Sequence, residues 1–229
     1  MKRMIPLIIL LILMAAVHYT GLCDYLSFEQ LKMHREDLKR WVAMYPILAP
    51  AAYICIYFIA TALSVPGGAI LSIAGGFLFP QPYSTLFVLV GATTGATTVF
   101  LIAKTSVGDL IMQKAGGRLH KMQEGFKDNA ASYLLFLRLV PLFPFWLVNI
   151  APAFFGVSLA TYVWTTLVGI IPGVFAFTQA GAGLGSILDK GEEFSIDAIF
   201  TTEIKIALIA LGIFALLPVV LKRLQKKHD

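Results

Sequence analysis

The chain has 229 residues, of which 58% are hydrophobic and 14% are charged, and its formal net charge is +5. An ordinary soluble domain carries about 25% charged residues, so this composition excludes a soluble globular protein and indicates an all-α, polytopic membrane protein. Loops that face the cytoplasm account for the basic balance, and nucleic acid is not needed as a partner.

Four uninterrupted apolar runs approach the length of about 20 residues that a transmembrane helix needs. The first follows Met1-Lys2-Arg3 and is too long for the core of a signal peptide, so we expect an uncleaved span. The four predicted spans are residues 5–22, 83–103, 159–180 and 204–221.

After the first run, residues 27–42 form a predicted amphipathic helix. Ser27 and Gln30 have the spacing of a capping box, and apolar residues from Phe28 to Val42 recur on roughly one face. We expect this helix to lie along the outer membrane interface.

Two further hydrophobic segments are broken by proline and glycine. Residues 46–80 contain the stretch from Ser64 to Gly68 and a Gly75-Gly76 pair, and residues 133–156 contain Pro141, Pro144 and Pro152. Proline removes a backbone donor and glycine weakens a helix by about 1 kcal/mol, so neither segment should cross the bilayer as one straight helix. Both are predicted to be re-entrant hairpins.

Loop charges predict the orientation of the chain. Lys and Arg gather at the N-terminus, in residues 104–128 and in the tail after residue 221, whereas residues 181–203 are acidic. The positive-inside rule puts both termini and loop 104–128 in the cytoplasm. Each half is then one hairpin plus one span, in opposite orientations, which is an inverted repeat. A full crossing by residues 46–63 remains open and would invert half of this topology.

Three regions follow. Residues 1–44 hold the first span and the interfacial helix, residues 45–185 the two inverted repeats, and residues 186–229 the acidic external loop, the last span and the basic tail.

Arg138 is the leading candidate for a binding residue, because it is the one charge between Asn129 and Leu188. A charge at membrane depth costs on the order of 3 kcal/mol, so it needs a partner or an aqueous cavity. Its guanidinium can hold a phosphate through two parallel hydrogen bonds. The alternative is that Arg138 reaches the interface and binds helix-end carbonyls. The rest of the predicted substrate-binding set is Asn149, Pro141, Pro144 and Gln179; Asn149 and Gln179 would alternatively cap broken helices.

No pattern for an enzyme, a cofactor or a metal is present. The four histidines are scattered, and the glycines of residues 181–185 lack the dinucleotide-binding spacing. No Asp or Glu occurs between Asp37 and Asp109, which argues against proton coupling through a carboxylate in the first hairpin.

The motifs of both halves resemble the VTT domain of the DedA superfamily, also called the SNARE-associated Golgi protein domain. The first half has Val65-Pro66-Gly67-Gly68 and then Gly75-Gly76-Phe77-Leu78-Phe79. The second half has Phe136-Leu137-Arg138-Leu139-Val140-Pro141, then Pro144, Asn149 and Gly156, and a T-x-x-G-x-x-P signature from Thr166 to Pro172. The resemblance covers residues 45–185.

This resemblance implies two hairpins that face each other across the bilayer and an activity of moving phospholipid or polyprenyl-phosphate lipid between leaflets. Arg138 matches the family's arginine in position. The chain lacks the acidic residues of proton-dependent members, and Phe79-Pro80-Gln81 replaces a glycine that often follows that phenylalanine, so ion coupling is in doubt. The expected hairpin and hinge positions are Pro66, Gly67, Gly68, Gly75, Gly76, Gly156, Gly169, Pro172 and Gly173.

We therefore expect a scramblase or flippase in the cell (inner) membrane whose partners are phosphate-bearing lipids. Two alternatives are an ion-coupled transporter of a small solute and a non-transporting assembly factor. Whether the protein forms a homo-oligomer is left open.

Overall fold

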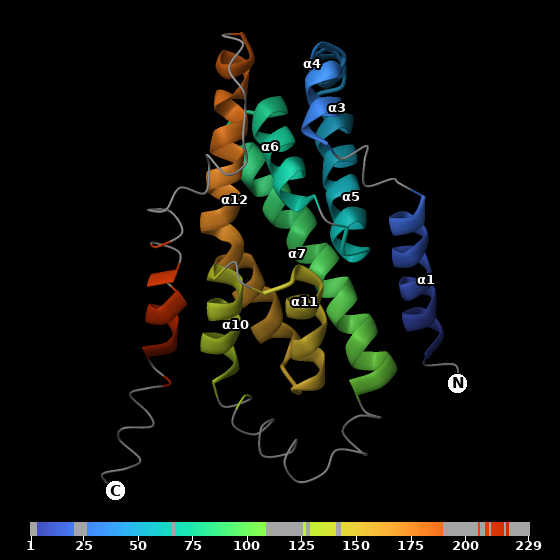
Figure 1. Ribbon diagram of the computed structural model, residues 1–229, viewed down its shortest axis with the longest axis vertical. Coiled ribbons are helices and arrows are strands. Elements are labelled where there is room, and N and C mark those ends of the chain that lie inside the picture. Colours follow the sequence, from blue (N-terminus) through green and yellow to red (C-terminus); the bar gives the residue numbers. More distant parts are fainter. Residues whose placement is uncertain are drawn as a thin grey trace, which may run out of the picture. The chain divides into compact units, whose positions relative to one another are not determined.

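Helices are the only regular elements in the part of the chain that the computed structural model describes. That part comprises residues 4–20, 27–65, 67–108, 126, 129–140, 143–189, 206, 209–210, 212–217 and 219. The chain divides into two compact units. The first unit contains residues 9–96 and 171–201, and the second contains residues 1–8, 97–170 and 202–229. Figure 1 shows the helices in chain order.

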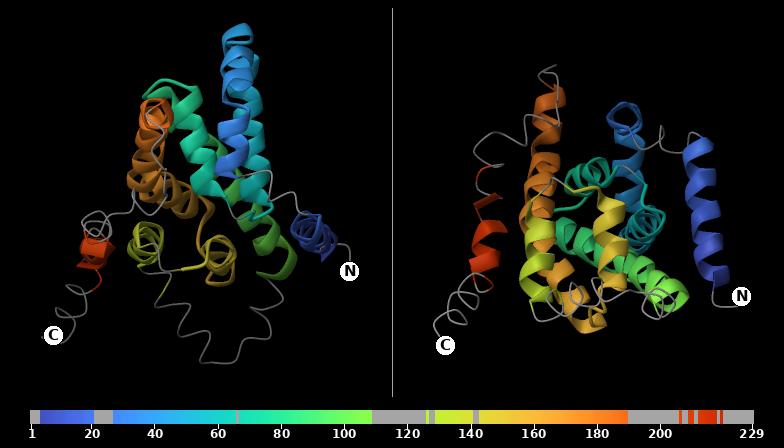
Figure 2. Two further views of the ribbon diagram at one scale, coloured as in Figure 1. Left: turned by 45° about the horizontal axis from the view of Figure 1, so that its top comes forward. Right: turned by 60° about the horizontal axis from the view of Figure 1, so that its bottom comes forward.

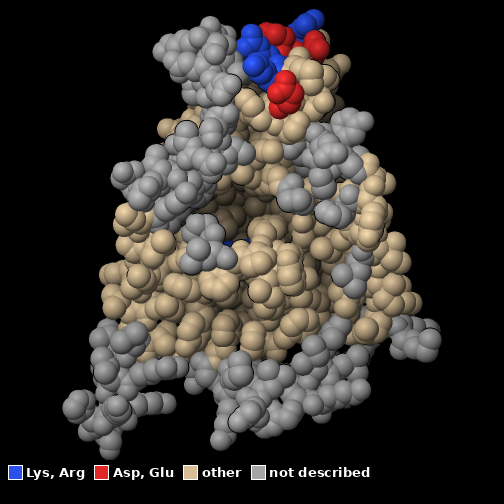
Figure 3. Space-filling view, in the orientation of Figure 1, with Lys and Arg blue, Asp and Glu red and all other residues tan. Residues whose placement is uncertain are grey.

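The first unit begins with α1 (Ile5–Tyr19), most of which belongs to it. The predicted amphipathic helix is two helices, α3 (Phe28–Met33) and α4 (Arg35–Met44), which meet at His34. One of the two bonds of the predicted capping box is confirmed, because the Ser27 side chain accepts a hydrogen bond from the Gln30 backbone N–H at 3.3 Å. Charged side chains gather over α3 and α4, and the described surface elsewhere in that view is almost wholly uncharged (Figure 3).

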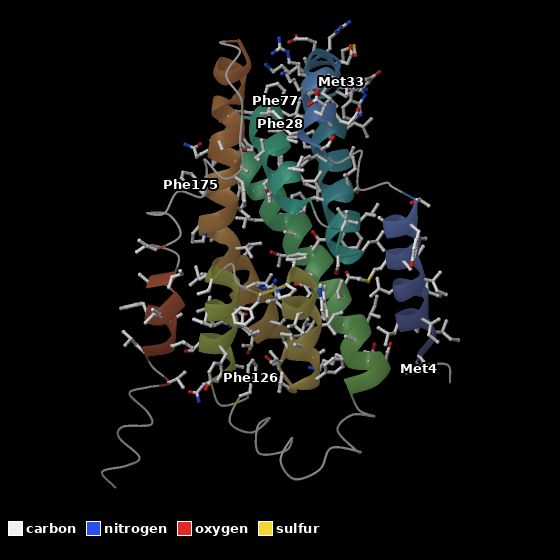
Figure 4. All side chains as sticks on the ribbon, in the orientation of Figure 1. Met4, Phe28, Met33, Phe77, Phe126 and Phe175 are labelled. Carbon is white, nitrogen blue, oxygen red and sulfur yellow. The ribbon has the colours of Figure 1, made fainter. Side chains whose placement is uncertain are left out.

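Apolar residues of α3 and α4 pack on protein. Leu31 forms a buried core with Ile73, and Phe28, Leu38, Phe77 and Phe177 surround that core. Phe28 and Phe77 lie close together in Figure 4. The predicted position along the outer interface is not tested by these contacts, but part of the predicted apolar face covers the neighbouring helices.

A break between residues 64 and 68 is confirmed: α5 (Leu48–Ala62) ends before it and α6 (Gly68–Leu78) begins after it. Gly67 turns the chain with a φ of 145°, which disfavours any side chain there. The two helices contact each other (Figures 1 and 2). Tyr53 donates to the Leu71 carbonyl at 2.8 Å and Tyr57 donates to the Gly68 carbonyl at 3.2 Å, so phenolic hydroxyls link the hairpin.

α6 also approaches α12 (Leu159–Asp189) within the first unit. A Cβ at Gly76 would overlap the backbone of Thr178, and a Cβ at Gly181 would overlap the backbone of Ile73. At the same crossing, the Gln81 side-chain amide donates to the Thr178 hydroxyl at 2.8 Å. Glycine at both contact points therefore lets the two backbones come together.

The second unit contains a second helical hairpin. α10 (Ala130–Leu139) and α11 (Phe145–Phe154) contact each other, and Pro144 is the N-cap of α11, so the predicted break is confirmed (Figure 2). Pro152 was predicted to break the segment as well, and this was wrong: it lies inside α11, near its end. A proline there interrupts only the last turn of the helix.

Two long helices contribute residues to both units. α7 (Tyr83–Ala103) continues as a π-helix, η2 (Lys104–Gly108), and α12 runs for 31 residues through Pro172. By length and composition, residues Tyr83–Ser106 and Leu159–Gly183 are candidate membrane spans. The other two predicted spans are not among them: α1 has 15 residues, and residues 204–221 are described only in part.

Candidate functional site

Arg138 lies in the last turn of α10 and is half-buried in the second unit. Its guanidinium donates three hydrogen bonds. Nη1 donates to Asn149 Oδ1 at 2.8 Å, and Nη2 donates to the Tyr162 hydroxyl at 2.9 Å and to Thr166 Oγ1 at 3.0 Å. These contacts with side chains differ from the alternative in which Arg138 binds helix-end carbonyls.

The three acceptors come from two neighbouring helices. Asn149 lies on α11, where it is fully buried, and Tyr162 and Thr166 lie one turn apart on α12. Residues four apart share a face of a helix, so one side of α12 presents both hydroxyls to Arg138. The Tyr162 hydroxyl in turn donates to Asn149 Oδ1 at 3.3 Å, which closes the network.

Hydrogen-bond donors remain at this site. A guanidinium has five N–H groups, and three are paired here. The Asn149 side chain has 0% exposure, and its Nδ2 has no hydrogen-bond partner among the described residues. A buried donor left without a partner costs about 1–3 kcal/mol, so the free N–H donors of the site favour the binding of an acceptor.

The charge of Arg138 has no counter-charge in the described part of the second unit. All three of its acceptors are neutral, and the described residues of that unit include no Asp or Glu. A cation in apolar surroundings requires compensation, and spare N–H donors beside it favour an anion with several oxygens. Chemically, the arrangement suits a phosphate group.

Packing holds the network in place. Phe100 of α7 stacks on Tyr162 with a centroid distance of 4.2 Å and an interplanar angle of 12°. Gly169 faces the stem of Arg138, and a Cβ there would lie 2.7 Å from Arg138 Cβ. Only glycine at position 169 therefore lets α10 approach α12 this closely without a shift of Arg138.

The structure brings together only part of the predicted binding set. Arg138 and Asn149 are bonded directly, and Pro144 caps the helix that carries Asn149. Gln179 is exposed on the part of α12 that belongs to the first unit. Pro141 lies outside the described residues.

Sequence reasoning did not single out Tyr162 or assign Thr166 a contact. Thr166 begins the T-x-x-G-x-x-P signature and Tyr162 precedes it by one helical turn. That spacing was the available signal, and it becomes meaningful only once α12 is known to lie beside α10.

The predicted hinge positions take several roles. Gly67 and Gly156 adopt positive φ angles of 145° and 68°, and Gly68 begins α6. A Cβ at Gly75 would collide with the Tyr53 ring, Pro172 lies inside α12, and a Cβ at Gly173 would meet nothing within 4 Å. Pro66 lies outside the described residues.

Composition and the described helices define an integral membrane protein that holds an arginine among neutral side chains. The VTT domain matches residues 65–183, more than half of the chain. The chain belongs to the VTT domain family of the DedA superfamily, as its motifs predicted.

Similar proteins from other organisms support this assignment. Transmembrane protein 41 homolog of Caenorhabditis elegans is 31% identical over 173 residues, which cover 74% of this chain and 68% of that protein. Transmembrane protein 41B of Homo sapiens is 28% identical over 183 residues, which cover 78% of this chain and 60% of that protein. Transmembrane protein 41 homolog of Dictyostelium discoideum is 26% identical over 200 residues, with coverages of 86% and 58%. The chain therefore spans about three fifths to two thirds of the length of these relatives. No solved structure matches the chain significantly.

Proposed function

We propose that the protein moves phosphate-bearing lipids between the leaflets of the cell (inner) membrane. One observation carries this proposal: Arg138 and Asn149 have N–H donors without a partner among the described residues, in a unit whose described residues include no carboxylate. A phosphate headgroup supplies both the missing negative charge and the missing acceptors. Membership of a family whose members are linked to lipid scrambling supports the same activity.

The route that we propose runs through two re-entrant hairpins in an inverted repeat. Each unit contains one helical hairpin, α5–α6 or α10–α11, together with segments of α7 and α12. In both units a glycine of the long helix packs on the first helix of the hairpin: Gly91 faces Tyr57, and Gly169 faces Arg138. This likeness supports the repeat, and the charge of the loops supports cytoplasmic termini.

Lipid flipping in sealed vesicles tests the proposal. Dithionite is added to proteoliposomes that contain the purified full chain and fluorescent phosphatidylglycerol. Wild-type protein should allow quenching beyond the outer leaflet, because labelled lipid from the inner leaflet becomes accessible. Arg138→Gln should slow this phase strongly, and Arg138→Lys should also slow it, since an ammonium cannot reproduce the guanidinium fork.

Arg40→Gln is the matched control, because Arg40 is exposed and pairs with Asp37 on α4. It should flip lipid at the wild-type rate. Quenching confined to the outer leaflet with wild-type protein, or an Arg138→Gln rate equal to that of Arg40→Gln, would contradict the proposal.

A further inference from the structure

Lys104 is, besides Arg138, the second cation among the described residues of the second unit. Its sequence position predicts a residue of the cytoplasmic loop 104–128, but the structure places it half-buried at the start of η2. Its Nζ donates to the Val157 carbonyl at 2.7 Å and lies 5.4 Å from the centroid of the Phe100 ring. An ammonium has three N–H donors, and the other two have no partner among the described residues.

An aromatic pair connects Lys104 with the Arg138 site. The ammonium of Lys104 lies over the ring of Phe100, and this ring stacks on Tyr162 with a centroid distance of 4.2 Å. The guanidinium carbon of Arg138 lies 5.5 Å from the Tyr162 ring centroid. Each ring thus holds one cation, in the geometry of a cation–π contact. Two like charges in one small unit repel each other, and an anion that contacts both would offset this repulsion.

Lys104 and Arg138 are the only charged residues among those described in the second unit. Two half-buried cations without a described carboxylate leave a positive charge that apolar surroundings compensate poorly. The Val157 carbonyl fixes the ammonium in place but carries no charge to neutralise it. The same argument that gives Arg138 an anionic ligand therefore applies to Lys104.

We propose that Lys104 is a second contact for the phosphate headgroup, joined to the Arg138 site through the Phe100–Tyr162 pair. This inference rests on the proposed function of Arg138 and adds a residue on a different helix. The ligand is the phosphate of a lipid. The ammonium of Lys104 would bind it as a point charge, and the guanidinium of Arg138 would bind it through two parallel N–H groups. The competing role for Lys104 is a structural clamp that holds the turn between α11 and α12 by its hydrogen bond to Val157.

Two substitutions separate these roles. Lys104→Gln keeps an N–H donor for the Val157 carbonyl and removes the charge, whereas Lys104→Arg keeps the charge. Lys39→Gln is the matched control, because Lys39 is exposed on α4 and lies 4.4 Å from the centroid of another ring, that of Phe77. The melting temperature without ligand reports whether each variant folds.

Binding is measured on the full chain in detergent as the shift in melting temperature upon titration with dioctanoyl phosphatidic acid. Dioctanoylglycerol, which lacks the phosphate, and inorganic phosphate are titrated in parallel. Lys104→Gln should weaken the binding of the phosphatidic acid about tenfold, since a hydrogen bond to a charged group is lost. Lys104→Arg and Lys39→Gln should bind as wild type does, and a shift with the phosphatidic acid alone identifies a lipid headgroup rather than free phosphate as the ligand.

Three outcomes overturn the proposal. If Arg138→Gln weakens binding and Lys104→Gln does not, Lys104 is a structural residue and the proposed function stands. If Lys104→Gln lowers the melting temperature without ligand but leaves the affinity unchanged, Lys104 is the clamp. If wild-type protein shows no shift with the phosphatidic acid, both the second contact and the Arg138 site fail together.

Discussion

At the scale of single residues, the described partners of Arg138 are neutral oxygens rather than a carboxylate. Thr166 supplies one of them, and the Thr166→Val substitution removes that acceptor while keeping the shape of the side chain. Because hydrogen bonds to charged groups contribute about 1.5–3 kcal/mol, we expect Thr166→Val to lower the free energy of unfolding by that amount and to slow lipid flipping. Denaturant titration in detergent and the dithionite assay measure the two effects.

Thr165 provides the control for this substitution. It is buried next to Thr166, but its hydroxyl bonds back to the Thr161 and Tyr162 carbonyls of its own helix. Thr165→Val should therefore cost less than about 1 kcal/mol, because those carbonyls keep their helical bonds. Equal losses in both variants would show that the Arg138–Thr166 bond contributes nothing of its own.

Gly169 leads to a second prediction at the same scale. In Gly169→Ala the added methyl would lie 2.7 Å from Arg138 Cβ, so α10 must shift or the arginine must change rotamer. We expect slower flipping and a lower melting temperature, despite the higher helix propensity of alanine.

Gly183→Ala on the same helix is the comparison, because a Cβ there meets nothing within 4 Å. It should leave flipping unchanged and raise the melting temperature slightly. A Gly169→Ala variant that behaves in the same way would show that the close approach of α10 is not needed.

Residue chemistry explains how far the site could be predicted. Arg138 and Asn149 stand out in the sequence, because a charge or an amide in an apolar segment costs free energy and the apolar segment can be recognised from the neighbouring residues. Tyr162 and Thr166 are unremarkable by the same criterion, since a threonine hydroxyl usually bonds back to its own helix and a tyrosine carries no formal charge. Their role depends on the crossing of α10 and α12, which no local pattern specifies.

At the scale of elements, both helical hairpins were predicted because proline and glycine act on their own backbone. The split at His34 and the tolerance of Pro152 were missed for a related reason. Leu31 and Leu38 pack around a shared core from two short helices, and such tertiary packing overrides a continuous helical pattern. Pro152 interrupts a bond only near the end of a ten-residue helix, where little is lost.

The turn of the first hairpin gives a prediction about an element. Gly67 has a φ of 145°, which strains any residue with a side chain, whereas Gly68 is the first helical residue of α6. Gly67→Ala should destabilise the protein by about 1–3 kcal/mol. Gly68→Ala should be tolerated, because its Cβ would lie 3.5 Å from the Tyr57 hydroxyl, an ordinary contact. Thermal unfolding of both variants in one detergent decides the matter, and a larger loss in Gly68→Ala would mean that the turn differs from the one described.

At the scale of the whole molecule, composition and family membership establish a membrane protein, but they leave its orientation as a prediction. Helix bounds do not reveal which side of the bilayer a loop faces. The charge of a loop does reveal its side, because loops rich in Lys and Arg stay in the cytoplasm whatever the packing of the helices. Loop 104–128 is the informative segment: it should face the cytoplasm if residues 46–80 return to the side they entered, and the outside if residues 46–63 cross.

Single cysteines test this orientation in a background that carries Cys23→Ser and Cys55→Ser. Lys114→Cys and Lys226→Cys should react with a membrane-impermeant maleimide only after the cells are opened, and Glu192→Cys should react in intact cells. The physical reason is that the five cationic residues between 104 and 128 resist translocation, whereas the acidic loop does not. Labelling of Lys114→Cys in intact cells would show that the first hairpin crosses the bilayer, and the inverted repeat that we propose would then be lost together with the facing hairpins that it implies.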